Sequence, residues 1–137
     1  MALINITSGT VSADFNNYSP ISQDGNLLAG AVLGAGDACR IASDGLVYQT
    51  VTTAGDSTGT TSQRSSFDGF VLKGYALSEP VTLFSAGSVI GNYAASMTPG
   101  TVLYASATLG ALSDAVILAN DQPVAKAISG NDIRVLR

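Results

Sequence analysis

Residues 36–47 read GDACRIASDGLV, and this stretch decides the fold class. Two short runs of strand-forming residues flank the pair Asp44-Gly45, and both turn residues tolerate the positive φ that a tight hairpin loop requires. The same order of strand, glycine turn and strand recurs in residues 78–89, SEPVTLFSAGSV, and in residues 100–112, GTVLYASATLGAL. We predict that each of the three stretches is a β-hairpin.

The rest of the chain continues this pattern. Short runs of Val, Ile, Leu, Tyr and Thr alternate with Gly, Asp, Asn and Ser, and no dozen residues sustain helical apolar spacing. The predicted strands are 37–42, 46–51, 69–75, 81–85, 88–91, 101–106, 116–118, 123–127 and 132–136. Since 137 residues suit one domain, we predict an all-β fold: a compact single domain, barrel-like or sandwich-like, built from short hairpins.

Two segments lack this alternation of strand-forming runs and turn residues. Residues 52–66, TTAGDSTGTTSQRSS, contain no aliphatic side chain larger than alanine and are predicted to form a mobile surface loop, or to order against a partner. Residues 1–26 are predicted to be an extended N-terminal arm ahead of a β domain at 27–137. The arm either begins as an edge strand and packs on its own domain, or reaches a neighbouring subunit or another protein. In the second case Phe15 and Tyr18 are the natural anchors.

Charge and composition exclude several classes of protein. Only 12% of residues are charged, and six Lys or Arg against ten Asp or Glu give a net charge of −4. The basic residues are scattered, so we predict no nucleic-acid partner; only Arg134 and Arg137 could form a small patch. The apolar runs are short and broken by Gly and Ser, so we predict no membrane span. The first ten residues do not resemble a secretory signal, which indicates synthesis in a cytoplasm.

Few residues in this sequence could serve as catalytic groups or metal ligands. There is no histidine, and the one cysteine, Cys39, lies in an apolar run that predicts a buried side chain. The glycine-rich run GAVLGAG at 30–36 departs from GxGxxG, so we expect its glycines to serve close backbone packing. Most acids sit beside Gly or Asn, as in turns. We predict no catalytic residue, no cofactor and no metal, although a hydrolase that uses two carboxylates stays open as an alternative.

Four segments, taken in order, carry a resemblance to a known family. They are AGDACRIASDGLVYQ at 35–49, FDGFVLKGYALSEPVTLF at 67–84, TPGTVLYASATLGALSD at 98–114 and QPVAKAISGNDIRVL at 122–136. Together they resemble the small decoration, or cement, proteins that coat the heads of tailed bacteriophages, over residues 27–137. The resemblance implies an all-β, barrel-like domain that forms a homotrimer on the outer face of an icosahedral capsid. The implied partner is the major capsid protein, which the trimer braces against internal DNA pressure without catalysis.

The resemblance implies a virion location and gives the N-terminal arm a role. In this interpretation the arm around Asp14, Phe15 and Tyr18 contacts the capsid or the next subunit. The alternative is a trimeric receptor-binding or fibre module of a virion, which would share the same composition. Copy number separates the two, because a decoration protein is present in hundreds of copies per particle and a tail fibre in a handful.

Overall fold

The computed structural model describes residues 3–4, 12–13, 20–21, 27–51, 67–116 and 122–136. Over this part of the chain there are twelve strands and no helix. The strands are β1 (Leu3–Ile4), β2 (Ser12–Ala13), β3 (Pro20–Ile21), β4 (Ala38–Ile41), β5 (Val47–Gln49), β6 (Gly69–Phe70), β7 (Leu83–Phe84), β8 (Val89–Gly91), β9 (Val102–Ala105), β10 (Leu112–Ser113), β11 (Ala125–Ala127) and β12 (Ile133–Val135). The prediction of an all-β fold is confirmed.

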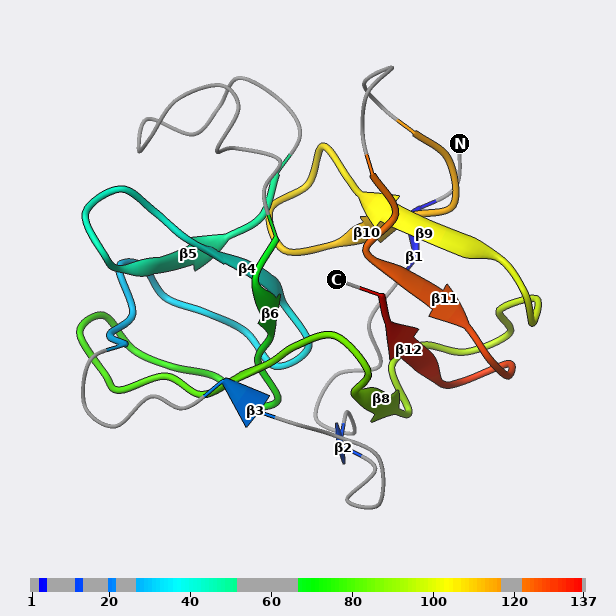
Figure 1. Ribbon diagram of the computed structural model, residues 1–137, viewed down its shortest axis with the longest axis horizontal. Coiled ribbons are helices and arrows are strands. Elements are labelled where there is room, and N and C mark those ends of the chain that lie inside the picture. Colours follow the sequence, from blue (N-terminus) through cyan, green and yellow to red (C-terminus); the bar gives the residue numbers. More distant parts are fainter. Residues whose placement is uncertain are drawn as a thin grey trace.

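The strands form two antiparallel sheets, which Figure 1 shows with β4, β5 and β6 on one side of the view and β9 to β12 on the other. The seven-stranded sheet has the order β1-β10-β9-β11-β12-β8-β2, and the five-stranded sheet has the order β3-β7-β6-β4-β5. Neither sheet closes into a barrel. Of the two predicted architectures, the sandwich-like one therefore describes the molecule better.

The hairpin predicted around Asp44-Gly45 is confirmed. β4 pairs antiparallel with β5, and Gly45 adopts a φ of +82° in the turn. The Gly45 N–H donates to the Ala42 carbonyl at 2.9 Å, and the Leu46 N–H donates to Asp44 Oδ1 at 3.0 Å. The aspartate closes the turn with its side chain, and the glycine supplies the left-handed backbone.

The other two predicted hairpins have different outcomes. β9 and β10 pair around Gly110, which has a φ of +75°, so the hairpin at 100–112 is confirmed. The prediction at 78–89 is wrong, because β7 belongs to the five-stranded sheet and β8 to the seven-stranded sheet. The turn itself is present, since the Ser88 N–H donates to the Ser85 carbonyl at 3.0 Å and Gly87 has a φ of +90°. This turn carries the chain from one sheet to the other.

The five-stranded sheet is buried on both faces near β4. Ala38 packs in the larger core with Phe70, Leu103 and Leu112, whereas the next residue, Cys39, packs in a smaller core. The smaller core comprises Ala29, Leu33, Cys39, Val47, Val71, Tyr75, Val81 and Leu83. Burial on both faces explains why β4 shows no alternation of apolar and polar residues: three of its four residues are apolar, and the fourth, Arg40, is buried.

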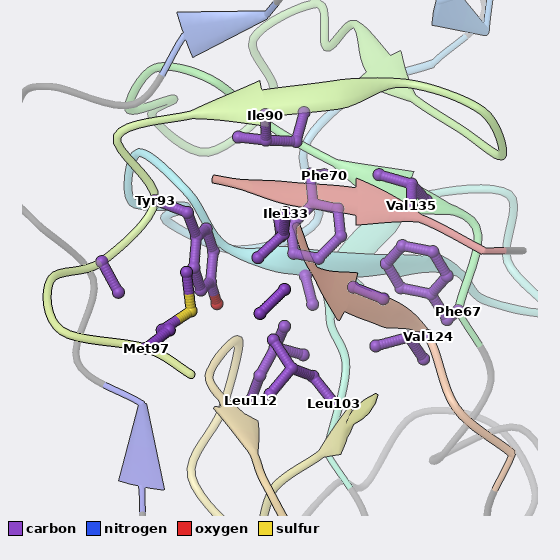
Figure 2. Packing of buried hydrophobic residues seen from close by; sticks show 14 residues of the cluster. Phe67, Phe70, Ile90, Tyr93, Met97, Leu103, Leu112, Val124, Ile133 and Val135 are labelled. Carbon is purple, nitrogen blue, oxygen red and sulfur yellow. The ribbon is translucent and has the colours of Figure 1, made fainter. Parts of the chain in front are cut away.

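The larger core fills the space between the two sheets. Figure 2 shows Phe70 from the five-stranded sheet among Ile90, Ile133 and Leu103 of the seven-stranded sheet. The Phe70 ring makes edge contacts with Phe67, at 5.0 Å between ring centroids, and with Tyr93, at 5.7 Å. This core holds the two sheets together.

The predicted strand boundaries need several corrections. β6 ends at Phe70 instead of continuing to residue 75, and Tyr75 pairs separately with Leu33. β10 was predicted only as the second strand of the hairpin at 100–112, and Val116, predicted to start a strand, lies outside one. The predicted loop at 52–66 lies outside the described residues. An edge strand at the start of the arm was one of the two predicted arrangements and agrees with β1, whereas β2 and β3 were missed because two-residue strands leave no periodic signal.

Candidate functional site

The predicted contact residues Asp14, Phe15 and Tyr18 lie outside the described residues. The strands on either side of them are described. β2 pairs with β8 at one edge of the seven-stranded sheet, and β3 pairs with β7 at the edge of the five-stranded sheet. The connection that contains the three residues therefore begins on one sheet and ends on the other.

The N-terminal segment supplies an edge strand at three places. β1 and β2 are the two outer strands of the seven-stranded sheet, and β3 is an outer strand of the five-stranded sheet. At these three points the arm packs on its own domain, which is the first of the two predicted arrangements. Each strand covers backbone N–H and C=O groups that would otherwise offer an open edge to another chain.

The best-formed polar site is the carboxylate of Asp37, at the junction of the two sheets. Asp37 is 8% exposed, and its Oδ2 accepts hydrogen bonds from the Gly34 N–H and from Gln49 Nε2, both at 2.8 Å. Gly110, in the β9–β10 turn, lies against the same carboxyl group. Its N–H donates to the Thr50 carbonyl, and its own carbonyl accepts from the Ala38 N–H, each at 2.9 Å. The junction thus joins β4 and β5 to a turn of the other sheet.

The environment of Asp37 changes its proton affinity and that of its neighbours. Burial raises the pKa of Asp37 above its usual value of 3.8, and this effect outweighs the two hydrogen bonds, which lower it. Burial, and then the nearby Asp37 charge, raises the pKa of Tyr93 and of the Cys39 thiol. Cys39 is therefore a protonated, buried thiol whose Sγ lies 3.5 Å from the Asp37 carbonyl oxygen. The predicted burial of Cys39 is confirmed.

Asp37→Asn is expected to change the pH dependence of folding. Because the folded-state pKa of Asp37 is raised, its protonated form is favoured by folding. The resulting contribution to stability is fully present at pH below the usual pKa of 3.8 and is lost as pH rises through the raised pKa. The asparagine side chain of the variant does not titrate. Relative to wild type, the variant should therefore be more stable, with a larger free energy of unfolding, at pH 7 than at pH 4. Urea unfolding followed by far-UV circular dichroism at both pH values measures this difference. An equal difference at both pH values would contradict it.

A second polar group supports the β4–β5 hairpin. The Arg40 side chain is fully buried, and its Cζ lies 5.4 Å from the centroid of the Tyr48 ring. The Tyr48 hydroxyl donates to Asp44 Oδ2 at 2.8 Å. Burial lowers the pKa of Arg40, while Tyr48, Asp44 and Asp68 act in the opposite direction. The contacts among Arg40, Tyr48 and Asp44 thus connect the hairpin turn to β4 and β5.

Gly30 is needed where the Tyr48 ring covers the backbone. A Cβ on Gly30 would lie only 2.5 Å from Tyr48 Cζ. The prediction that glycines of the run 30–36 serve close packing is therefore confirmed at this position. Here the Gly30 backbone packs against the ring of Tyr48. A sequence pattern does not specify which side chain will lie against a glycine.

Exposed apolar side chains occur in both halves of the molecule. In the five-stranded half, Val32 is 71% exposed and Leu77 is 62% exposed, on two segments linked by the Leu33–Tyr75 bridge. In the seven-stranded half, Leu3 and Leu136 are exposed. Isolated exposed aliphatic residues are ordinary on protein surfaces, so neither pair identifies a partner by itself.

Potential metal ligands are dispersed over the part of the chain that the structure describes. Among these residues, no three His, Cys, Asp or Glu side chains come together in a way that could hold a metal ion. No helix in the described ranges is long and apolar enough to cross a membrane.

Comparison with known proteins gives no relative to guide the assignment of a site. No protein-family model, curated protein or solved structure matches this chain. The resemblance to phage decoration proteins therefore stays a prediction from sequence pattern.

Proposed function

We propose that this protein is a capsid decoration protein. It binds as a homotrimer to the outer surface of the icosahedral head of a tailed phage, contacts the major capsid protein, and stabilises the shell against internal DNA pressure. It acts by binding and performs no catalysis.

The observation that carries the proposal is the place of the four resembling segments in the fold. Residues 35–49 contain β4 and β5, residues 67–84 contain β6 and β7, residues 98–114 contain β9 and β10, and residues 122–136 contain β11 and β12. The four segments thus supply every interior strand of the two sheets except β8, and most of the core between the sheets. The resembling pattern thus coincides with most of the strands that hold the two sheets together.

The mechanism follows from linked binding. Each subunit of a trimer needs only a modest contact with the shell, because three linked contacts raise the overall affinity by about 10²–10⁴ over one. A trimer that binds the assembled shell and not its dissociated subunits stabilises the shell by mass action. A charge-poor chain whose described surface carries scattered exposed aliphatic residues is compatible with such a small, repeated contact.

The arm residues provide a direct test of the contact. Replacing Asp14, Phe15 and Tyr18 together with alanine is expected to weaken binding to phage heads by about tenfold or more, because buried aromatic anchors carry much of the energy of an interface. Asn16→Ala with Asn17→Ala is the matched control in the same segment and should bind like wild type. Sedimentation with purified heads measures both variants. Wild-type binding by the triple variant would show that the arm makes no contact.

Point substitutions are a better test than truncation. Deleting residues 1–20 would remove β1 and β2 and half of β3, and would uncover the edges formed by β10, β8 and β7. Open edges promote aggregation, so lost binding by a truncated chain would not identify the contact. The alanine variants leave the residues of all three strands in place.

Copy number separates this proposal from a trimeric fibre module. Quantitative mass spectrometry of purified particles should find the chain in hundreds of copies, in a fixed ratio to the major capsid protein. A handful of copies per particle would instead identify a receptor-binding or fibre protein, and the decoration proposal would be wrong.

A further inference from the structure

The outer face of the seven-stranded sheet brings two cations together. Lys126 on β11 is the direct cross-strand partner of Arg134 on β12. The residues beside them in each strand, Ala125, Ala127, Ile133 and Val135, are buried in the larger core. Because side chains alternate between the faces of a strand, Lys126 and Arg134 both point away from the core, and both are exposed.

The row that contains these cations has no carboxylate. Lys126 pairs on its other side with Val102 of β9, and Arg134 pairs with Val89 of β8. Asp132 lies just before β12, two residues ahead of Arg134 and on the same face, and its Oδ1 accepts the Asn92 N–H at 3.0 Å. We call Val102, Lys126 and Arg134 the basic row; Val89 is buried and is not part of this surface.

The basic row is unfavourable for the isolated fold. Directly opposite residues in an antiparallel pair have Cβ atoms about 4.5–5.5 Å apart, and like charges there are destabilising. Two of only six Lys and Arg residues in a chain of net charge −4 occupy this one pair. Folding does not require cations at these positions, because exposed sites on a sheet accept many residue types.

The surroundings of the basic row suit a protein partner. Tyr104, two residues beyond Val102 on β9, is half-buried, and Leu136, two residues beyond Arg134, is 41% exposed. Tyrosine and arginine are enriched at the centres of protein interfaces, and arginine binds carboxylates through two parallel hydrogen bonds. Two cations are few for a nucleic acid, which proteins hold through many phosphate contacts.

We infer that the basic row, with Tyr104 and Leu136 beside it, is a docking surface for a carboxylate-bearing face of another protein. This inference rests on the proposed function for the identity of that protein, which is then the major capsid protein. Charge complementarity carries the assignment: the row offers two adjacent cations, and an acidic face relieves their mutual repulsion as it binds.

Arg134→Glu tests the inference because it separates binding from folding. The substitution replaces a like-charge pair with an opposite-charge pair across β11 and β12 but also places a second carboxylate near Asp132, so the melting temperature should change little. Binding to stripped phage heads at low salt should fall by about tenfold. Lys73→Glu is the matched control, since it changes the net charge equally. Lys73 lies away from the row, with its Nζ 5.1 Å from the Tyr75 ring centroid, and this variant should bind within about twofold of wild type.

The outcomes distinguish failure of the inference from failure of the proposed function. If wild type binds heads and Arg134→Glu binds equally well, the docking surface is wrong and the decoration function stands. If wild type does not bind heads, the decoration function is wrong, and retention on a poly-L-glutamate matrix decides the inference alone. Arg134→Glu should then elute at lower salt than Lys73→Glu, and co-elution would overturn the docking surface. Arg134-dependent retention on duplex DNA but not on polyglutamate would overturn the carboxylate assignment.

Discussion

Phe70→Ala is expected to lower the free energy of unfolding by about 3–5 kcal/mol, the cost of truncating a fully buried phenylalanine in a core that closes only partly over the cavity. Phe70 has no exposed surface and lies on β6, between β4 and β7. Its ring contacts Phe67 and Tyr93, so the substitution also removes two edge-to-face aromatic contacts. A domain of ordinary stability, about 5–15 kcal/mol, would lose a large part of it.

Urea unfolding followed by far-UV circular dichroism, at a fixed protein concentration, measures the effect of Phe70→Ala. Leu77→Ala is the control, because Leu77 is 62% exposed and its loss should change stability by no more than about 0.5 kcal/mol. A Phe70→Ala protein as stable as the Leu77→Ala protein would mean that the core between the sheets is not arranged as described.

Gly110→Ala is expected to cost about 3–4 kcal/mol, for two reasons that add. The backbone there has a φ of +75°, which costs an L-residue about 1–2 kcal/mol. The new Cβ would also lie 2.7 Å from Asp37 Cγ, so the carboxyl group must move and weaken its hydrogen bonds to Gly34 and Gln49. The substitution therefore weakens the contacts at the junction between the two sheets.

Gly45→Ala isolates the first of these two reasons. Gly45 has a φ of +82°, and a Cβ there would meet nothing within 4 Å. Its substitution should therefore cost only the backbone part, about 1–2 kcal/mol. Thermal unfolding of the two alanine variants under identical conditions makes the comparison. Equal losses would show that Asp37 does not crowd Gly110.

The fold class was predictable from the sequence because turn chemistry is local. Asp44-Gly45 specifies a tight hairpin whatever the rest of the chain does, and the β4–β5 pair followed directly from it. Burial of Cys39 and close packing at Gly30 were likewise readable from apolar context and from glycine. The particular contact at Gly30, the ring of Tyr48, depends on tertiary structure and was not predictable.

Strand partners were less predictable than strands, because pairing is not local. Residues 78–89 have the same pattern as the true hairpin at 36–47, yet β7 and β8 join different sheets. The turn at Ser85–Ser88 fixes only where the chain reverses and not which strand lies beside the next one. The edge strands β1, β2 and β3 depend entirely on partners far along the chain.

The candidate interaction surface was missed in part for the same reason. The sequence suggested that Arg134 could share a small patch with Arg137, its neighbour along the chain. The structure pairs Arg134 with Lys126 across two strands. A usable signal was present, because each cation stands between two small or aliphatic residues, as VAKA and DIRV. Combined with a β11–β12 hairpin, that alternation would have placed both cations on one outer face.

The central claim, that this chain decorates a phage capsid, is tested most directly by sedimentation with DNA-filled heads stripped of their surface proteins. Heads from the phage source that the proposal implies are mixed with increasing amounts of purified protein, and the copies bound per major capsid subunit are counted. The account predicts saturation at a fixed ratio set by the symmetry of the shell, with bound trimers that protect the heads from disruption. Absence of binding, or binding confined to a few copies at the tail, would contradict it.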